Sequence, residues 1–474
     1  MRARIHLLFF AFSFCLSHNT FAQVQSFEKR YDTLGCYYAK CIRQSFDGGY
    51  LMFGSSYSLT TQQDLAIIKT DSLGNLIWVK IYGGPNTDGA KNAVVTPDSN
   101  YLVVGIKDAS ANNSIWILKI NNSGDTLWTK TTIMGIGDNT PTSVENTYDG
   151  GFIITGYCSA RGMGLLDVYL IKINAIGDTL WSKTYGNVGT DQGFSVKQTT
   201  DSGFVIAGVT NSSGSSDAYV IKTNSVGDTI WTKAFGFSNV DWANSIQQTH
   251  DLGYIVSGYS WNVTANNYEI YLIKLNNNGD SVWTKHIGDV LENYSENLQL
   301  TQDGGFILCG TTWTNNNNYD AFLVRTDSLG DTLWTKKFGG NNEEKGYFVQ
   351  NTNDGGFVLT GSSDSYLPNS VYLVKTDSLG NLFTNIKLIS SDYLFYVFPN
   401  PTSESLHIKS FSNCDIHKIE YKLFNLMGTE IKSNIIEVGD FDSEINLNGI
   451  TSGIYIIELF KNGILIHSYK IIII

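Results

Sequence analysis

The sequence is poor in charge, in proline and in histidine. Only 16% of its 474 residues are charged, six are proline and seven are histidine, whereas glycine occurs 46 times and aromatic residues make up 13%. So little charge beside 42% apolar residues excludes a disordered chain, and the glycine content favours strands joined by tight turns over helices. The net charge is −12. A nucleic-acid partner is therefore excluded, because phosphate binding needs a basic surface.

Long apolar runs are absent after the first 22 residues, so the sequence predicts no transmembrane span, which needs roughly 20 apolar residues. Residues 1–22 contain two early arginines, continue with an apolar run from Leu7 to Leu16 and end in Ala22. This pattern is typical of a secretory signal peptide, with cleavage expected before Gln23. We therefore expect an exported, soluble mature chain.

Cysteine pairs and catalytic motifs are also scarce. Five cysteines remain after removal of Cys15, at no metal-ligand spacing. Cys158 and Cys309 lie in apolar runs and are predicted to be buried thiols, while a disulfide between Cys36 and Cys41 is left open. No P-loop, zinc-protease or nucleophile motif occurs. We predict no catalytic residue, metal ligand or cofactor from motifs, but a spatial pair of carboxylates for glycoside hydrolysis is invisible at this level.

The sequence repeats itself about every 50 residues. The clearest marker is an aromatic residue followed four positions later by glycine, with an aspartate three positions before the aromatic residue. The seven pairs are Tyr50/Gly54, Tyr101/Gly105, Phe152/Gly156, Phe204/Gly208, Tyr254/Gly258, Phe306/Gly310 and Phe357/Gly361. A second marker is the series Trp78, Trp128, Trp181, Trp231, Trp283 and Trp334, with Phe383 in the seventh position.

Each repeat divides into four runs of strand length separated by turn residues. In the third repeat these runs are TSVENTY, FIITGY, DVYLIKI and TLWSKTY. Their patterning indicates a four-stranded antiparallel meander, and the apolar third run indicates a strand covered on both faces. Seven such sheets are the signature of a seven-bladed β-propeller. We therefore predict an all-β fold, with the propeller over residues 23–388.

Two segments outside the complete repeats bear on how the ring closes. Residues 26–32 align with the fourth strand of the other repeats, with Phe27, Lys29 and Tyr31 in the Trp, Lys and aromatic positions. Residues 382–388 have lost both the Trp and the Lys. Because a ring of sheets must hide its last edge, we predict that the N-terminal strand completes the last blade. Residues 382–388 should leave the ring or pair weakly.

The turn between the third and fourth strands reads DSLGDTLW at residues 327–334. Its order of Asp, Gly and Trp resembles the tryptophan-docking turn of quinoprotein-like propellers and the Asp box of sialidase-type propellers. The resemblance implies a role in blade construction and transfers no active site. We expect the glycine to adopt a positive φ and the tryptophan to fill the space between blades.

Charged residues recur at two positions of the repeat. An acidic residue follows the Trp by ten positions at Asp88, Asp138, Asp191, Asp241 and Glu344, with Asn293 in the remaining repeat. These loops should surround the channel mouth, where a ring of carboxylates could hold calcium or a basic ligand; alternatively each acid caps a turn or pairs with a strand lysine such as Lys80, Lys183 or Lys233. A basic residue recurs in the third strand, for which we predict structural pairing: Lys69, Lys119, Lys172, Lys222, Lys274, Arg325 and Lys375.

The loops between the second and third strands are the least repetitive part of the chain. They bring Trp261, Tyr268, Trp313 and Tyr319 among asparagines and serines, on the same face as the acidic loops. Aromatic rings beside amides suit carbohydrate or peptide binding, because rings stack on sugars while amides bond hydroxyls. The alternative is that these rings pack only on their own loops.

After residues 389–394, which we take as a linker, the repeat ends and a different sequence pattern begins. Residues 395–474 contain short strands and turns that predict a small immunoglobulin-like sandwich of about seven strands. The motifs in order are Pro399, Asn400 and Pro401, then LFNLMG ending at Gly428, then Gly453 and Tyr455, and finally Lys470. In this order and at this end of the chain they resemble the type A C-terminal sorting domain of the type IX secretion system of Bacteroidetes.

The resemblance implies a route and a partner. A protein with this domain crosses the inner membrane by its signal peptide, engages the type IX secretion machinery through the domain, and reaches the outer surface or the medium. Removal of the domain and attachment of the remainder to lipopolysaccharide commonly follow. An adhesive or purely stabilising sandwich is the competing interpretation.

Two functions remain open on these grounds. The first is a secreted or surface binding module whose variable loops take a glycan, peptide or protein ligand. The second is a secreted degradative enzyme that acts on glycans with carboxylates from the channel mouth. The sequence favours the first, because it contains no recognisable catalytic motif.

Overall fold

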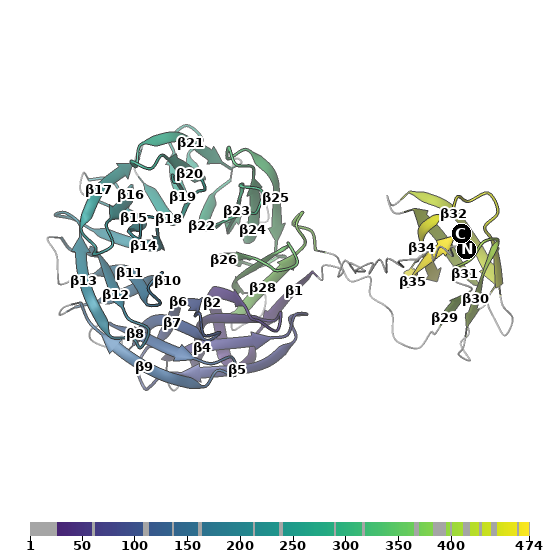
Figure 1. Ribbon diagram of the computed structural model, residues 1–474, viewed down its shortest axis with the longest axis horizontal. Coiled ribbons are helices and arrows are strands. Elements are labelled where there is room, and N and C mark those ends of the chain that lie inside the picture. The colour runs from purple at the N-terminus through teal and green to yellow at the C-terminus, as the bar shows by residue number, and fades with distance from the viewer. Residues whose placement is uncertain are drawn as a thin grey trace, which may run out of the picture. The chain divides into compact units, whose positions relative to one another are not determined.

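The described part of the chain is almost entirely β-strand (Figure 1). The computed structural model describes residues 26–58, 62–107, 113–134, 137–159, 164–211, 214–236, 240–288, 291–314, 318–364, 369–382, 395–398, 401–410, 418–425, 429–437, 443–461 and 464–473. Contacts divide the chain after Leu382 into two compact units. Apart from the 3-10 turn η1 (Thr33–Gly35), the described elements are strands. The predicted signal peptide lies outside the described residues.

Seven four-stranded sheets form the first unit, and we number these blades in chain order. Blade one contains β2 (Cys36–Gln44), β3 (Tyr50–Ser58), β4 (Gln62–Thr70) and β5 (Leu76–Tyr82). Blade two contains β6 (Gly89–Val95), β7 (Tyr101–Lys107), β8 (Ser114–Ile120) and β9 (Thr126–Thr132). Blade three contains β10 (Asn139–Asn146), β11 (Phe152–Cys158), β12 (Asp167–Ile173) and β13 (Thr179–Tyr185). Blade four contains β14 (Asp191–Gln198), β15 (Phe204–Thr210), β16 (Asp217–Thr223) and β17 (Thr229–Phe235).

The remaining blades complete the ring. Blade five contains β18 (Asp241–Gln248), β19 (Tyr254–Asn262), β20 (Asn267–Leu275) and β21 (Ser281–Ile287). Blade six contains β22 (Asn293–Leu300), β23 (Phe306–Trp313), β24 (Tyr319–Thr326) and β25 (Thr332–Phe338). Blade seven contains β26 (Glu344–Asn351), β27 (Phe357–Ser363), β28 (Ser370–Thr376) and β1 (Phe27–Tyr31). The first strand of each blade faces the centre (Figure 1), which confirms the seven-bladed propeller.

The N-terminal strand closes the ring as predicted. β1 pairs antiparallel with β28, and Phe27 lies opposite Lys375 just as Trp78 lies opposite Lys69 in blade one. The Tyr31 hydroxyl donates to the carbonyl of Gly74 at 2.6 Å. Blade seven therefore takes its outermost strand from the other end of the repeat, and no outer edge of β28 is left open. Residues 382–388 are predicted to leave the ring or pair weakly. Of these, Leu382 is described and packs against the core at the last blade, whereas residues 383–388 lie outside the described residues.

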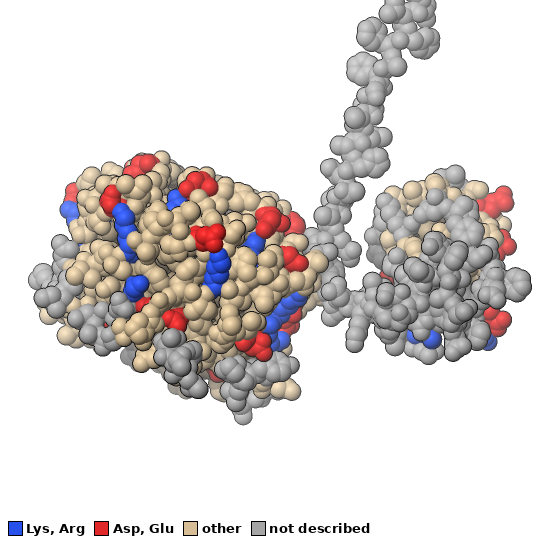
Figure 2. All heavy atoms as spheres, turned by 90° about the horizontal axis from the view of Figure 1, so that it is seen from below, with Lys and Arg blue, Asp and Glu red and all other residues tan. Residues whose placement is uncertain are grey.

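The repeated turn forms the seam between neighbouring blades. Gly227 has a φ of +82°, and a Cβ added there would lie 2.7 Å from the ring of Trp181 in the preceding blade. Beside it, the Lys183 ammonium binds the Asp228 carboxylate at 3.0 Å. Figure 2 shows basic and acidic groups side by side on the outer face. The matching ion pairs at other seams are Lys80–Asp125, Lys130–Asp178, Lys233–Asp280 and Lys285–Asp331.

These pairs correct one sequence-based alternative, in which Lys80, Lys183 and Lys233 neutralise the loop acids. The lysines reach the aspartate of the turn in the next blade instead. A strand lysine two residues after the Trp lies on the outermost strand, whereas the loop acids lie at the start of the innermost strand. The width of a four-stranded sheet separates the two positions.

The basic residue of the third strand pairs within its own blade, as predicted. In blade four the nearly buried Lys222 binds Asp201 at 2.9 Å and also donates to the carbonyl of Thr223. The equivalent pairs are Lys69–Asp47, Lys119–Asp98, Lys172–Asp149, Lys274–Asp251, Arg325–Asp303 and Lys375–Asp354. The aspartate of each turn thus satisfies a cation inside an otherwise apolar strand.

The second unit is a two-sheet sandwich. One sheet has the order β29 (Phe395–Phe398), β30 (Ser405–Ser410), β33 (Ser443–Asn446). The other has the order β32 (Glu430–Glu437), β31 (Lys418–Asn425), β34 (Gly453–Lys461), β35 (Ile464–Ile473). Their inner faces share a buried core that includes Leu406, Ile419, Ile457 and Ile471. The seven strands confirm the predicted sandwich.

Candidate functional site

Each inner strand carries a β-bulge near its middle. In β14 the pairing with β15 shifts between Gly193 and Ser195, so that Phe194 is the extra residue. A bulge turns the extra side chain out of the regular ladder. The equivalent residues of the other blades are Lys40, Lys91, Thr142, Asn244, Glu296 and Tyr347.

The glycine marker of the repeat is what makes room for the bulge. Gly208 pairs with Gly193 beside Phe194, and a Cβ on Gly208 would lie closer than 3.0 Å to the carbonyl oxygen of Gln192. The same crowding occurs at Gly54, Gly105, Gly156, Gly258, Gly310 and Gly361. The second strand must therefore lack a side chain where the first strand bulges.

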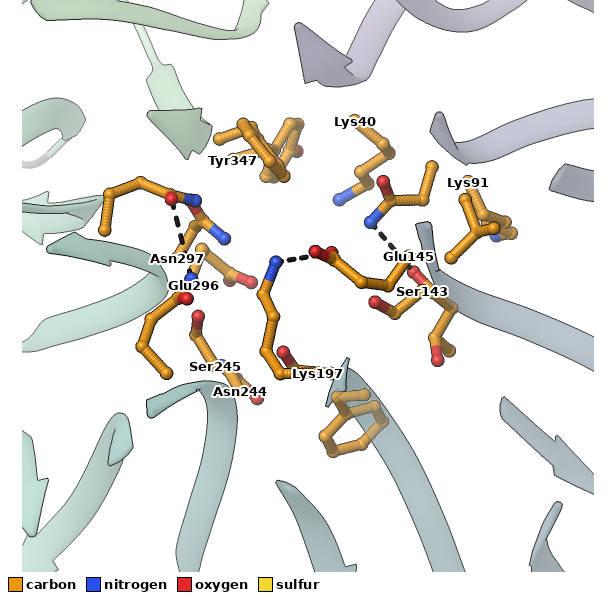
Figure 3. A pocket seen from close by; sticks show the side chains of 18 of the residues that line it. Lys40, Lys91, Ser143, Glu145, Lys197, Asn244, Ser245, Glu296, Asn297 and Tyr347 are labelled. Carbon is orange, nitrogen blue, oxygen red and sulfur yellow. Dashed lines mark hydrogen bonds and ion pairs between the residues drawn. The ribbon is translucent and has the colours of Figure 1, made fainter. Parts of the chain in front are cut away.

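The seven bulge residues line a central cavity of about 290 Å³ (Figure 3). Deeper along the inner strands, at the third residue after the bulge, the lining continues with Arg43, Glu145, Lys197, Gln247 and Gln299. Lys197 binds Glu145 across the cavity at 2.6 Å. We call this cavity the central channel. The residue types that line the channel differ from blade to blade, whereas the residues at the seams recur. The repeat architecture alone therefore does not determine the lining, which makes the channel a candidate binding site.

The loop acids lie beside this channel but serve the loops. Asp88, Asp191, Asp241 and Glu344 are almost fully buried. The carboxylate of Asp191 accepts a hydrogen bond from the backbone N–H of Asn187, four residues earlier, at 2.9 Å. Asp88 and Glu344 accept the equivalent bonds from the N–H groups of residues 84 and 340. This geometry favours the turn-capping alternative.

Blade three departs from this arrangement. Asp138, the predicted acid, is exposed. The buried position is held by its neighbour Asn139, whose side chain accepts from the N–H of Met134 and donates to the carbonyls of Asn113 and Gly137. The ten-residue spacing therefore misses the capping residue by one in this loop. Within the described ranges, no three His, Cys, Asp or Glu side chains are grouped as metal ligands.

A second carboxylate faces each buried loop acid in several blades. A Cβ added at Gly339 would lie 2.6 Å from Asp320 Oδ1 and 2.7 Å from Glu344 Oε2, so both carboxylates face the same glycine. Gly186 lies in the same way between Asp167 and Asp191. Burial, and then the nearby charge of Glu344, raise the pKa of Asp320 to about 6. Like charges placed this close oppose ionisation of one partner.

We expect Asp320→Asn to stabilise the propeller at neutral pH. The folded protein holds the Asp320 proton up to its pKa of about 6, whereas an unfolded chain releases it near pH 4. Stability therefore falls as pH rises from about 4 to 6, and the loss is complete above that range. After allowance for solvent screening, the variant should gain about 1 kcal/mol at pH 7.5 and nothing below pH 4. Urea unfolding at both pH values measures the difference in stability. An equal gain at pH 7.5 and below pH 4 would contradict the prediction. Asp32→Asn, at an exposed position, is the control.

The four predicted aromatic residues of the loops meet in one cluster. Trp261 lies against Tyr268 with ring centroids 4.9 Å apart, and Trp313 lies against Tyr319 at 4.6 Å. Tyr294 joins the two pairs, at 5.1 Å from Tyr268 and 6.4 Å from Tyr319. Glu292 accepts hydrogen bonds from the hydroxyls of both Tyr294 and Tyr319. All four predicted rings are half-buried, so part of each stays accessible.

One end of this cluster opens into a cleft between blades six and seven. The cleft has a volume of about 370 Å³ and is lined by Trp313, Asn318, Tyr319, Asn341, Asn342, Glu343 and Asp364. The Asn318 amide donates to the carbonyl of Asn342 at 2.6 Å, and the Glu343 N–H donates to Asp364 at 2.6 Å. These bonds fix the cleft wall before any ligand arrives. We call it the loop-face cleft.

The residues of the sorting motif fall in the sandwich, in part outside the described residues. Gly453 begins β34 and pairs with Ile473, and the buried Tyr455 donates from its hydroxyl to the carbonyl of Thr451 at 2.8 Å. Lys470 lies on β35 opposite Ile456. Pro401 is exposed just before β30. Pro399, Asn400 and Gly428 lie outside the described residues.

Sequence reasoning missed the channel residues. The signal that could have found them is the position directly after a small residue of the first strand, as in Gly193–Phe194, where the residue type changes in every repeat except the first two. Cys36 and Cys41, left open as a pair, are both buried free thiols. Cys158 and Cys309 are also buried, as predicted.

Comparison with known proteins identifies the second unit. Residues 396–474 match the family described as "Secretion system C-terminal sorting domain". No curated protein matches the sequence at a significant level. The second unit is therefore a type IX sorting domain, and the protein is secreted or displayed at the cell surface. The described residues contain no helix with the length and apolar character needed to cross a membrane.

Several solved structures are similar at low identity. PorZ of Porphyromonas gingivalis, titled an essential bacterial surface component of the type-IX secretion system, gives a TM-score of 0.42 at 10% identity over 93% of this chain and 59% of PorZ. Sqt1 from Chaetomium thermophilum gives 0.46 at 10% identity, over 73% and 98% of the two chains. The β-propeller domain of the Trilobed protease from Pyrococcus furiosus gives 0.43 at 10% identity, over 74% and 98%. The chain thus spans 59% of the length of PorZ.

Proposed function

We propose that the protein is an exported, non-catalytic module that binds glycans at the loop-face cleft. The observation that carries this proposal is the meeting of Trp313 and Tyr319 at 80° beside three asparagines and two carboxylates. An accessible ring face can stack on the apolar face of a sugar, and the amides and carboxylates can bond its hydroxyls. The sorting domain delivers the propeller to the place where such ligands occur. Attachment to lipopolysaccharide stays a prediction of the resemblance.

The degradative alternative has weaker support in this geometry. Four of the five acids expected to act at the channel mouth are buried, and three of them accept backbone hydrogen bonds within their loops. Such carboxylates cannot approach a glycosidic bond without unfolding the loop. Glu343 and Asp364 remain in the cleft, but Glu343 binds Lys345 at 2.7 Å and Asp364 caps the N–H of Glu343. Both have structural partners.

A glycan array probed with the mature protein tests the proposal. We expect binding to a restricted set of neutral glycans. Trp313→Ala should weaken this binding at least about tenfold, because loss of a stacking ring removes about 1.5 kcal/mol or more. Tyr148→Ala, which removes an aromatic residue with 69% exposure on a turn outside the cleft, is the matched control and should bind like the parent.

Two outcomes would contradict the proposal. Release of reducing ends from any bound glycan would support the degradative enzyme instead. Equal binding by Trp313→Ala and the parent protein would show that the cleft is not the site. Melting curves of both variants would show that their folds are intact.

A further inference from the structure

The central channel carries an excess of positive charge in an acidic protein. Its lining includes the basic residues Lys40, Arg43, Lys91 and Lys197 but only two acids, Glu145 and Glu296. The whole chain has a net charge of −12. A local reversal of sign inside a concave, partly water-excluded site concentrates anions there. The repeat does not explain this reversal, because the bulge position is basic in only two of the seven blades.

The two acids do not neutralise the excess. Glu145 is already engaged by Lys197 at 2.6 Å. Burial raises the pKa of Glu296, with Lys40 and Lys345 acting in the opposite direction. Among the residues that the structure describes, no carboxylate lies within ion-pair distance of Lys40, Arg43 or Lys91, and these three come from neighbouring blades one and two.

Two of the three cations are held in place by neutral groups. The Arg43 guanidinium donates to the carbonyl of Ile42 at 2.8 Å and to the Asn92 side chain at 3.3 Å, and it lies 4.6 Å from the ring of Phe348. The Lys40 ammonium lies 3.2 Å from the ring centroid of Tyr347. Both cations are therefore oriented, although their charge is not cancelled. Figure 3 shows Lys40 and Lys91 on the same side of the channel.

The rest of the lining has the chemistry of a sugar site. Amides and hydroxyls come from Asn92, Asn244, Asn297, Gln247, Ser143 and Ser245. Trp242 also lines the channel, where its ring is stacked on Phe194 at 5.2 Å and on Tyr259 at 5.5 Å, so these contacts hold it in place as part of the apolar wall. At about 290 Å³ the channel accommodates a small ligand, near the lower limit of roughly 300 Å³ for small-molecule pockets.

We propose that the central channel is a second binding site, for a sugar that bears a carboxylate, such as a hexuronate unit. Lys40, Arg43 and Lys91 receive the carboxylate, the amides and hydroxyls bond the sugar hydroxyls, and Trp242 and Tyr347 provide apolar walls. Arg is well suited to this role because its planar fork matches a carboxylate. This site is separate from the loop-face cleft and does not rest on the function proposed there.

Calorimetric titration of the full mature chain with D-galacturonate tests the assignment, with D-galactose and acetate as the neutral sugar and the sugar-free carboxylate. We expect galacturonate to bind at least about tenfold more tightly than either, since a hydrogen bond to a charged group contributes more than one between neutral groups. Lys91→Gln should lower the affinity for galacturonate about tenfold and leave the affinity for galactose unchanged. Lys183→Gln, a rim lysine paired with Asp228, is the matched control.

The pH dependence provides an independent measurement. Burial lowers the pKa of Lys40 to about 8, Glu296 raises it, and Lys91 and Lys345 lower it further. The ammonium is therefore lost above about pH 8, and galacturonate affinity should fall at least about threefold between pH 7 and 9.5 in the parent protein. Lys40→Gln should be weaker at pH 7 and should lose most of this dependence. The ring of Tyr347 faces the same ammonium.

Three results would overturn the assignment. Galacturonate binding no more tightly than galactose would refute the role of the cations. Acetate binding as tightly as galacturonate would indicate a site for simple carboxylates and not for a sugar. Unchanged galacturonate affinity in Lys91→Gln, with a melting temperature equal to that of the parent, would place the ligand elsewhere. Loop-face cleft variants such as Trp313→Ala should not alter any of these results.

Discussion

Replacement of Gly208 by alanine is expected to unfold or severely destabilise the propeller. A Cβ at this position would lie closer than 3.0 Å to the carbonyl oxygen of Gln192 and only 3.0 Å from Gly193 Cα, both in the backbone of the neighbouring strand. Neither atom can move unless the bulge at Phe194 is lost and β14 re-registers against β15. A one-residue slip would transfer every side chain of the inner strand to its opposite face. We expect a loss of at least about 4 kcal/mol, the range reserved for such defects.

The control for this prediction is another glycine with open space around it. A Cβ at Gly84 would meet no atom within 4 Å, and its N–H would still donate to Asp88. The free energy of unfolding of Gly84→Ala, measured in urea, should therefore lie within about 0.5 kcal/mol of that of the parent. Similar stability of Gly208→Ala and Gly84→Ala would show that the second-strand glycine does not accommodate the bulge.

Deletion of residues 26–32 from the mature chain is expected to open the ring. β1 contributes the buried Phe27 and Tyr31 and pairs along its length with β28, all of whose residues are buried. Removing two large aromatic side chains costs about 3–5 kcal/mol each, and the exposed edge of β28 becomes a template for association. We expect a much lower midpoint in thermal unfolding and concentration-dependent aggregation in light scattering.

Phe27→Trp is the matched variant, because the other six complete seams carry tryptophan at this position. The Gly74 turn contacts the Phe27 ring in the same way that the Gly124 turn contacts Trp78. The substitution should leave stability unchanged or raise it slightly. A monomeric, cooperatively unfolding deletion variant would contradict the role of β1 in closure.

The architecture was predictable from the sequence because the seams repeat. Trp181, Gly227 and Asp228 recur at a fixed spacing, since every blade must meet its neighbour through the same contacts. The same regularity located the closing strand, whose Phe27 and Tyr31 keep their positions in the pattern although they are far from it in the chain. The repeated residues therefore reveal the blade contacts, because each equivalent contact requires the same residue types.

The candidate site was less predictable because it consists of the positions that do not repeat. Trp313 and Tyr319 were found from the variability of their loop, but Glu292, which bonds Tyr319, has no sequence signal. The channel residues depend on a bulge whose sequence sign, the glycine of the second strand, lies on the neighbouring strand and not at the bulge itself. In blade three the capping residue is Asn139, one position later than the acid at the regular spacing, which spacing alone could not reveal.

The bulge also determines how such a protein can acquire a new specificity. Because the extra residue of each inner strand leaves the ladder, its side chain lines the channel and is not tied to the strand pairing of its own blade. Two of these side chains also join neighbouring blades, since Thr142 and Asn244 donate hydrogen bonds to the carbonyls of Gly193 and Ser295. Seven positions, one from each blade, define the inner wall. A combinatorial library confined to Lys40, Lys91, Glu296 and Tyr347 should therefore change the ligand while keeping the hydrogen bonds of Thr142 and Asn244 between blades.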